Sequence, residues 1–204
     1  MTAVPSGGKR CFGEGDPLYE HYHDTEWGYP VTDEHGIYER LCLEAFQAGL
    51  SWRTVLHKRE AFRDAFAGFD PGRVAHYTRR DVARLMDDAG IIRNRAKIEA
   101  AIGNARALLE LHEGDGTLAA LVWSFAPPRN RVPRSHAQVP ATTPQSEALS
   151  KTLRKLGFRF VGPTTAYAMM QAIGVVNDHL AECPVRAAVE QERIAALADM
   201  DQSR

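Results

Sequence analysis

The sequence predicts an all-α protein that folds as a single domain, expected over residues 11–186. Apolar residues recur at i, i+3, i+4 and i+7 along most of the chain, which is the helical period. No segment alternates apolar and polar residues as a strand would, and capping residues divide the chain at short intervals. The 204 residues suffice for one large or two small domains, and they contain no obvious linker or repeat.

The first third of the chain predicts three helices. Asp16 before Pro17 is typical of an N-cap followed by the first helical position, so a helix is expected to run from there towards Trp27. The next helices are expected over residues 33–47, ended by the glycine that follows, and over residues 51–68, where a serine caps and a glycine terminates.

The middle of the chain predicts four more helices. A short one opens at the Asp-Pro pair of residues 70–71, and Thr78 with Asp81 resembles a capping box for a helix that ends at a glycine. Longer and shorter helices follow over residues 94–112 and 117–125.

The last third predicts a long loop, two helices and a tail. Residues 126–142 carry four prolines and are expected to form a surface loop, which at that length is often functional or mobile. Helices are expected over residues 143–157 and after the Gly-Pro pair at 162–163. The charged, alanine-rich tail 187–204 is expected to be helical or frayed, and residues 1–10 to be a disordered N-terminal segment.

Composition excludes several classes of protein. The formal net charge of −1 argues against non-specific coating of nucleic acid, although a local basic face stays open. No apolar run approaches the ~20 residues of a membrane span, and the first residues lack the apolar core of a signal peptide. We therefore expect a cytoplasmic monomer with no membrane and no protein partner. Three cysteines, Cys11, Cys42 and Cys183, suggest metal binding or simple burial rather than a disulfide framework.

A carboxylate within an apolar helix marks a candidate pocket. Glu44 precedes Trp52 by eight residues across a Gly-Leu-Ser corner, and Tyr22 and Trp27 lie upstream. A buried carboxylate beside aromatic faces suits a planar, cationic or amine-bearing ring. The alternative is a solvated Glu and a core Trp. At the corner, Leu50 is either a wedge for a base stack or a buried residue.

Two cysteines and two histidines form a candidate metal site. Cys11 and His23 lie near one end of the chain, and His179 and Cys183 near the other, with i and i+4 spacing that would share a helix face. Two thiolates and two imidazoles are a tetrahedral zinc set, and four protein ligands imply a structural site that joins the termini. The alternative is surface histidines and unremarkable cysteines.

A helix–hairpin–helix signal spans residues 85–98. Two amphipathic helices meet at a glycine corner whose amide groups, with the next helix N-terminus, could hold a DNA phosphate. The candidate DNA-binding residues are Gly90, Ile91, Arg93, Arg95 and Lys97. An ordinary αα-hairpin is the alternative, because the second hairpin glycine is absent. A further basic group is either a second phosphate-facing surface or a solvated helix face: Lys151, Arg154, Lys155 and Arg159.

Taken together, several ordered blocks resemble the bacterial DNA-3-methyladenine glycosylase I family. They include YHDTEWG at residues 22–28, LEAFQAGLSW at 43–52, DAGIIR at 88–93, GFRFVG at 157–162 and VNDH at 176–179. The shorter blocks IGNAR and VWSF add to them, and the resemblance covers about residues 10–183.

The resemblance implies an all-α helix–hairpin–helix DNA glycosylase fold with one structural Zn²⁺ that joins the N- and C-terminal segments. Its ligands would be Cys11, His23, His179 and Cys183. Glu44 would be the catalytic, base-recognising residue, accepting hydrogen bonds from the adenine edge without an assigned general-base role. Tyr22 and Trp52 would stack on the base, and Trp27 would line the same region.

The implied activity is hydrolysis of the N-glycosidic bond of 3-methyladenine in alkylated double-stranded DNA, which leaves an abasic site. The base would leave the stack to be reached, and methylation at N3 makes it a cationic leaving group. This branch lacks the catalytic Asp of its relatives, and no Lys lies in the pocket motifs for a Schiff base.

Two departures from the family pattern matter. Phe12 and Gly13 follow the first cysteine where the family commonly has Gly and Trp, which affects one pocket-wall aromatic. The tail beyond Cys183 is longer than expected and would cover a surface or bind a partner. The competing functions are a zinc-stabilised helix–hairpin–helix DNA-binding module without catalysis, and hydrolysis of free nucleosides or another modified base.

Overall fold

A computed structural model describes residues 9–114 and 116–202 of the chain, and among them it contains helices and loops but no β-strand. The all-α prediction is therefore confirmed for these residues. The elements are α1 (Pro17–Thr25), α2 (Glu34–Gln47), α3 (Trp52–Leu56), α4 (Arg59–Ala65), η1 (Ala67–Phe69), α5 (Pro71–Val74), α6 (Arg79–Asp87), α7 (Arg95–Glu113), α8 (Leu118–Trp123), η2 (His136–Gln138), α9 (Pro144–Lys155), α10 (Pro163–Ala172) and α11 (Arg186–Gln202).

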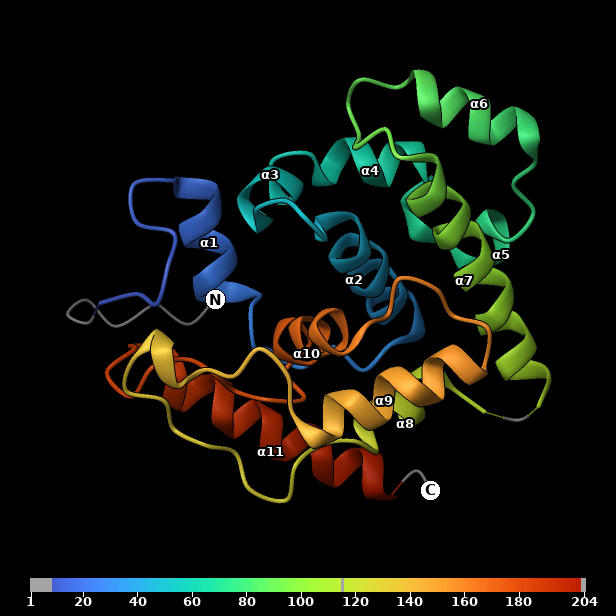
Figure 1. Cartoon of the computed structure of the whole chain (residues 1–204). Helices are drawn as coiled ribbons and strands as arrows, with labels where there is room; N and C mark the ends of the chain where they lie inside the picture. The colour runs from blue at the N-terminus through green and yellow to red at the C-terminus, as the bar shows by residue number, and fades with distance from the viewer. Residues whose placement is uncertain (1–8, 115, 203–204) are drawn as a thin grey trace.

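Helix α2 lies at the centre of the molecule, with α10 beside it and the other helices around them (Figure 1). Every residue of α2 from Ile37 to Phe46 is buried, so no face of this helix is open to solvent. Aliphatic and aromatic side chains supply most of that burial and form the main core with α3, α7, α8 and α10. Three charged side chains lie within the same buried stretch: Glu39, Arg40 and Glu44.

Local capping chemistry sets most helix starts where the sequence predicts them. Asp16 accepts from the amide of Tyr19, and Thr78 with Asp81 forms the predicted capping box. The expected helix over residues 51–68 is wrong in one respect, because it divides into α3 and α4. The amide of Lys58 bonds to the carbonyl of Val55, and this tighter i→i−3 turn ends α3.

The C-terminal residues form part of the domain rather than a separate tail. Helix α11 packs near α8, with Val189, Arg193 and Ala196 buried. The guanidinium of Arg186 donates to the carbonyls of Asn177 and His179 and ties the start of α11 to the preceding loop. The longer tail therefore covers a surface of its own chain.

The N-terminal segment is only partly described. Residues 1–8 of the expected disordered segment lie outside the described residues, whereas Arg10 is held by Asp24 through Nε at 2.9 Å and Nη2 at 2.8 Å. Residues 126–142 form the predicted loop, interrupted by the single turn η2. Over the described part of the chain, none of the helices combines the length and apolar character that a bilayer crossing requires.

Candidate active site and metal centre

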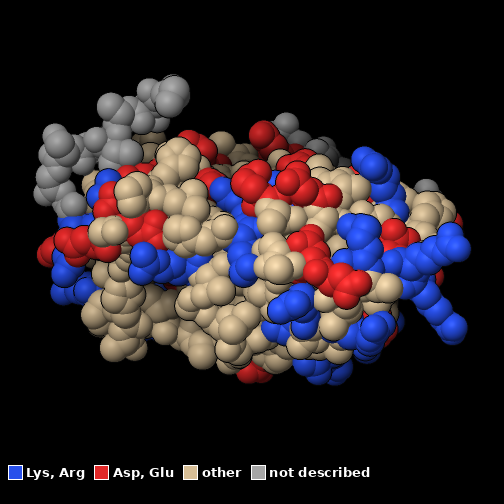
Figure 2. Space-filling model, turned by 90° about the horizontal axis from the view of Figure 1, so that it is seen from above, with Lys and Arg blue, Asp and Glu red and all other residues tan. Residues whose placement is uncertain are grey.

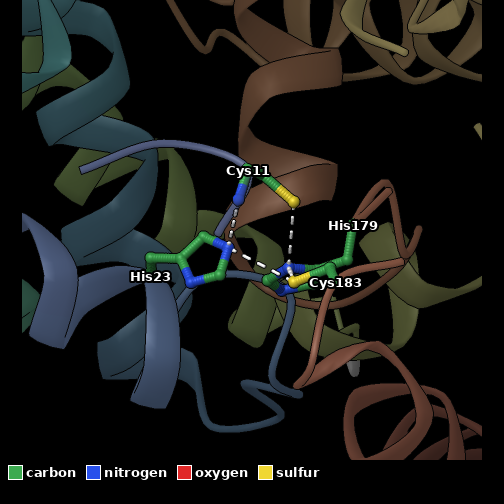
Figure 3. A group of neighbouring side chains, drawn as sticks. All are labelled: Cys11, His23, His179 and Cys183. Carbon is green, nitrogen blue, oxygen red and sulfur yellow. Dashed lines mark hydrogen bonds between the residues drawn. The ribbon is translucent and has the colours of Figure 1, made fainter. Parts of the chain in front are cut away.

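The four predicted metal ligands converge on one buried point (Figure 3). The Sγ atom of Cys183 lies 3.3 Å from Nδ1 of His179 and 3.5 Å from Nε2 of His23. The Sγ atom of Cys11 lies 3.7 Å from Nδ1 of His179, and all four ligand atoms lie within 4.8 Å of one another. Tetrahedral zinc with these ligands separates neighbouring ligand atoms by about 3.3–3.8 Å, so the donor set fits that ion.

The ring nitrogens that face away from the cluster are fixed by oxygen atoms. Nδ1 of His23 lies 2.8 Å from Oδ1 of Asp24, and Nε2 of His179 lies 2.8 Å from the carbonyl oxygen of Trp27. Each of these nitrogens therefore carries the proton, and the nitrogen facing the cluster keeps its lone pair. Hydrogen bonding with Cys11 lowers the pKa of the Cys183 thiol, which favours a thiolate there.

One detail of the metal prediction is wrong. His179 and Cys183 do not share a helix face, because both lie in the loop of residues 173–185 between α10 and α11. Arg186 and Asn177 fix this loop. The side chain of Asn177 accepts a hydrogen bond from the backbone amide of His179, and its own Nδ2 donates to Glu190. The i, i+4 spacing brings the two ligands together in an irregular backbone instead.

Glu44 is the one acidic group of α2 that has no partner. It is 5% exposed, and its carboxylate accepts no hydrogen bond from a described residue. Burial raises the pKa of Glu44 to about 8, and the nearby positive charge of Arg40 opposes that rise. A neutral, buried carboxyl group of this kind is ready to ionise when a cation enters.

Tyr22 and Trp52 lie beside each other in this region, as predicted, but they are in mutual contact. Their ring centroids are 5.2 Å apart, with an angle of 41° between the planes. A planar ring inserted between two others needs about 7 Å between the outer centroids, twice the van der Waals separation. The rings must therefore part to admit a base, and Trp52 Nε1 is buried without a hydrogen-bond partner in the closed arrangement.

The structure places Trp27 with the metal cluster rather than beside Glu44. Its ring lies 4.5 Å from the ring of His179 and 5.0 Å from Phe12. The expectation that Trp27 lines the base pocket is therefore not supported by its contacts. It covers the cluster together with Phe12, Tyr29 and Leu180.

Phe12, which sequence reasoning treated only as a departure, links the two sites. Its ring lies 4.9 Å from His23 on the cluster side and 4.8 Å from Tyr19 and 6.4 Å from Tyr22 on the pocket side. In the sequence, the signal for this role was an aromatic residue directly after the first predicted metal ligand. Phe12 thus supplies an aromatic ring close to where the family pattern has a Trp.

A charged layer missed by the sequence reasoning lies next to the pocket. Glu26 binds Arg40 at 2.6 Å and Arg59 through two hydrogen bonds of 2.5 and 2.8 Å. These bonds lower the pKa of Glu26 to about 2 although burial opposes them, so it stays ionised at neutral pH. In the sequence, the signal for this layer was charged residues within otherwise apolar stretches. It did not reveal the pairing, because the paired residues are distant in sequence.

The corner between α2 and α3 presents Leu50 to solvent, at 45% exposure. This excludes the alternative of a buried residue. The corner is fixed from beneath by Lys97, whose Nζ donates to the carbonyls of Phe46 at 2.9 Å and Ala48 at 2.6 Å. Lys97 is 7% exposed, so its predicted contact with DNA phosphate is wrong: its ammonium group satisfies the C-terminal carbonyls of α2.

Two αα-hairpins offer glycine corners, and they differ in whether a side chain caps the helix that follows. Between α6 and α7, Arg93 and Arg95 are exposed and Ile91 is buried. The Asn94 side chain accepts a hydrogen bond from the amide of Lys97, and the amide of Gly90 donates to Oδ1 of Asp88. This corner therefore has fewer free backbone groups than the sequence suggested.

In the hairpin between α9 and α10, the amides of Gly157 and Arg159 also donate within the chain, and the difference lies at the start of α10. Gly157 adopts φ +88°, which L side chains rarely adopt, and α10 begins at Gly162 and Pro163 with no side-chain cap. Arg159 and Phe160 are exposed there.

Seen from above, acidic and basic side chains are interspersed over most of the face, and basic ones gather towards the end where α6 lies (Figure 2).

Comparison with known proteins gives consistent matches. The family model for methyladenine glycosylase matches residues 12–187. The chain is similar to DNA-3-methyladenine glycosylase 1 of Escherichia coli, with 51% identity over 82% of this chain and 91% of the relative. The Haemophilus influenzae DNA-3-methyladenine glycosylase is 46% identical, over 87% of this chain and 97% of the relative.

A solved structure extends the similarity to three dimensions. It is that of 3-methyladenine DNA glycosylase I from Staphylococcus aureus, which addresses the structural basis of 3-methyladenine recognition. The TM-score is 0.83 at 35% identity, over 87% of this chain and 95% of that chain.

The protonation of Glu44 predicts a pH-dependent stability. Its pKa is about 8 in the folded protein and 4.5 ordinarily, so the folded state holds the proton more tightly and wild-type stability falls between these pH values. Glu44→Gln lacks this loss and should gain about 4 kcal/mol relative to wild type between pH 5 and pH 9. Melting temperatures at both pH values measure it. The exposed Glu60→Gln should track the wild type, and parallel curves for Glu44→Gln would refute a buried neutral carboxyl.

Proposed function

Because the chain belongs to the methyladenine glycosylase family, we propose that it hydrolyses the N-glycosidic bond of 3-methyladenine in alkylated duplex DNA. The products are the free base and an abasic site. The observation that carries this proposal is Glu44, a buried carboxyl group without a partner near Tyr22, whose ring contacts Trp52. A binding module without catalysis has no need of such a group.

Recognition follows from charge. Methylation at N3 makes the base cationic, and a cation is attracted both to the faces of Tyr22 and Trp52 and to an ionised Glu44. Entry of the cation favours the ionised form of Glu44, so binding releases a proton to solvent. Neutral adenine provides no such compensation for an ionised carboxylate in this buried place.

The chemistry requires little from the protein beyond binding: the bond between the base and C1′ of the sugar breaks, water bonds to C1′, and the proton that this water loses passes to solvent. The base leaves the duplex to reach the pocket. Because the departing base already carries positive charge, it leaves as a neutral molecule and takes no proton from Glu44. Glu44 stabilises the base by accepting hydrogen bonds from its amine edge, and Trp52 Nε1 offers a donor when the rings part.

DNA contacts are assigned to two parts of the surface. Leu50, exposed at the α2–α3 corner, is the wedge that fills the gap left by the extruded base. The uncapped N-terminus of α10, with Arg154 and Arg159 nearby, is the principal phosphate contact, and Arg93 and Arg95 contribute a second.

Cys11, His23, His179 and Cys183 would hold one zinc ion as a structural staple. The ion would supply folding stability by joining the segment before α1 to the loop before α11. It would have no part in glycosidic cleavage, because all four of its positions would be filled by protein ligands.

Base release tests the proposed activity. The wild type should release 3-methyladenine from methylated duplex DNA, and Glu44→Ala should reduce the rate about 10- to 100-fold, because a charged hydrogen-bond acceptor is lost. Chromatography of the freed bases measures this, with the exposed Glu60→Ala as a matched control. Absence of release from folded wild type would favour the DNA-binding module, and free nucleoside outcompeting duplex DNA would favour nucleoside hydrolysis.

Salt dependence of DNA binding tests the hairpin assignment. Replacing Arg154 and Arg159 together with Ser should weaken binding to unmodified duplex and reduce the slope of log K against log salt by about 2. The matched pair Arg93→Ser and Arg95→Ser should have the smaller effect. An equal or larger loss in the second pair would return the main contact to the α6–α7 corner.

Metal analysis tests the staple. The purified protein should contain one zinc per chain, and its removal by a chelator should lower Tm by about 5 °C or more. Cys183→Ser should likewise remove the zinc and lower Tm. Cys42→Ser, which changes a buried cysteine outside the cluster, should leave the zinc content unchanged. A metal-free wild type with an unaltered Tm would contradict the assignment.

A further inference from the structure

Arg40 is the charged side chain next to Glu44 on α2. We propose that Arg40 is a positioning residue: Glu26 fixes its guanidinium against the ring of Tyr22, and from there it favours the charged form of Glu44 for a cationic base. This inference rests on the proposed function, since it assigns a role in recognition by the same pocket.

The placement of Arg40 is unusually well defined. It is 8% exposed, its Nη2 lies 2.6 Å from Oε2 of Glu26, and its Cζ lies 5.7 Å from the centroid of Tyr22. Arg59 holds the same Glu26 from α4, so the carboxylate is anchored from two sides. The guanidinium thus has a fixed position next to one aromatic wall of the pocket.

One nitrogen of Arg40 is left without an acceptor. Nη1 is buried and has no hydrogen-bond partner among the described residues. An unpaired donor on a buried guanidinium is costly, and an arginine cannot relieve that cost by losing its proton. Glu44, one turn further along the same face, accepts no hydrogen bond either, so the guanidinium and the carboxyl group are neighbours without an ion pair between them.

The surroundings of Glu44 make Arg40 its principal charged neighbour. From α1, Tyr19 and Tyr22 interact with Glu44, and burial raises the pKa of both phenols, so both are neutral at physiological pH. From α2, Arg40 is the cation that acts on Glu44, while Glu26 and Arg59 largely neutralise one another nearby. Burial is the larger influence on the ionisation of Glu44, and among the described charged groups Arg40 is the one that opposes it.

The direct experiment is a titration of Glu44 itself. The ¹³C shift of its carboxyl carbon is followed by NMR from about pH 5 to about pH 10 in wild type and variants. Arg40→Gln should raise the midpoint by about one pH unit or more, because an opposite charge is removed. Arg40→Lys, which keeps the charge, should stay close to wild type. The control Arg63→Met removes the partner of Glu39, which lies on α2 like Glu44, and should leave the Glu44 midpoint unchanged.

A measurement on the wild type decides the matter even if Arg40→Gln does not fold. The guanidinium ¹⁵N signals of Arg40 should shift with the same midpoint as Glu44. Guanidinium signals that stay constant through that midpoint would overturn the proposal. An unchanged Glu44 midpoint in a folded Arg40→Gln would also overturn it.

The pH profile of base release separates this inference from the proposed function. Release should increase with pH through the Glu44 midpoint. That rising limb should move to higher pH in Arg40→Gln and return to its wild-type position in Arg40→Lys. A role in folding alone would lower the rate without moving the limb, and that result would overturn the inference. A wild type that releases no base but shows coupled Arg40 and Glu44 signals would overturn the proposed function and leave the electrostatic pairing in place.

Discussion

The burial of charged side chains in α2 is the constraint on which the rest of the structure depends. This helix is enclosed on every side, yet it carries Glu39, Arg40 and Glu44. Two of them are paired with residues of other segments, Glu39 with Arg63 of α4 and Arg40 with Glu26. Each pairing fixes a neighbouring segment against the central helix. Glu44 is the exception. A buried carboxyl group without a partner on this enclosed helix indicates a site for a ligand that brings a positive charge.

Adjacent residues of one short helix serve two different sites. On α1, Tyr22 faces the aromatic pocket and His23 faces the metal cluster. Phe12 lies between them and touches rings on both sides. Asp16, the N-cap of α1, also accepts from His57 at 2.7 Å and from Arg53 at 2.6 Å, which ties α1 to α3. These bonds lower the pKa of Asp16 to about 2, so the tie persists at neutral pH. A metal staple on α1 would therefore steady one wall of the pocket as well as the chain ends.

Sequence reasoning succeeded where the determining interactions are local. Caps such as Asp16 and Thr78 act within three residues, so helix starts could be predicted from the chain alone. The four-residue metal set could be assembled because its donor chemistry is distinctive, even though the local geometry of His179 and Cys183 was predicted wrongly. The roles of Lys97 and Trp27 could not be predicted. Lys97 binds carbonyls 49 and 51 residues away, and no pattern in the sequence distinguishes such a lysine from an exposed one.

The free energy of ionising Glu44 offers a physical basis for selectivity in the proposed reaction. In the closed pocket the carboxyl group is best accommodated in its neutral form, and the two rings contact each other, so neither feature attracts a neutral base. Separating the rings and charging the carboxylate both cost free energy. A cationic base offsets both costs at once, through the aromatic faces and through the carboxylate, whereas unmodified adenine offsets only the loss of ring contact. Arg40, fixed at a distance by Glu26, reduces the cost of charging Glu44 without forming the ion pair that would remove Glu44 from the ligand.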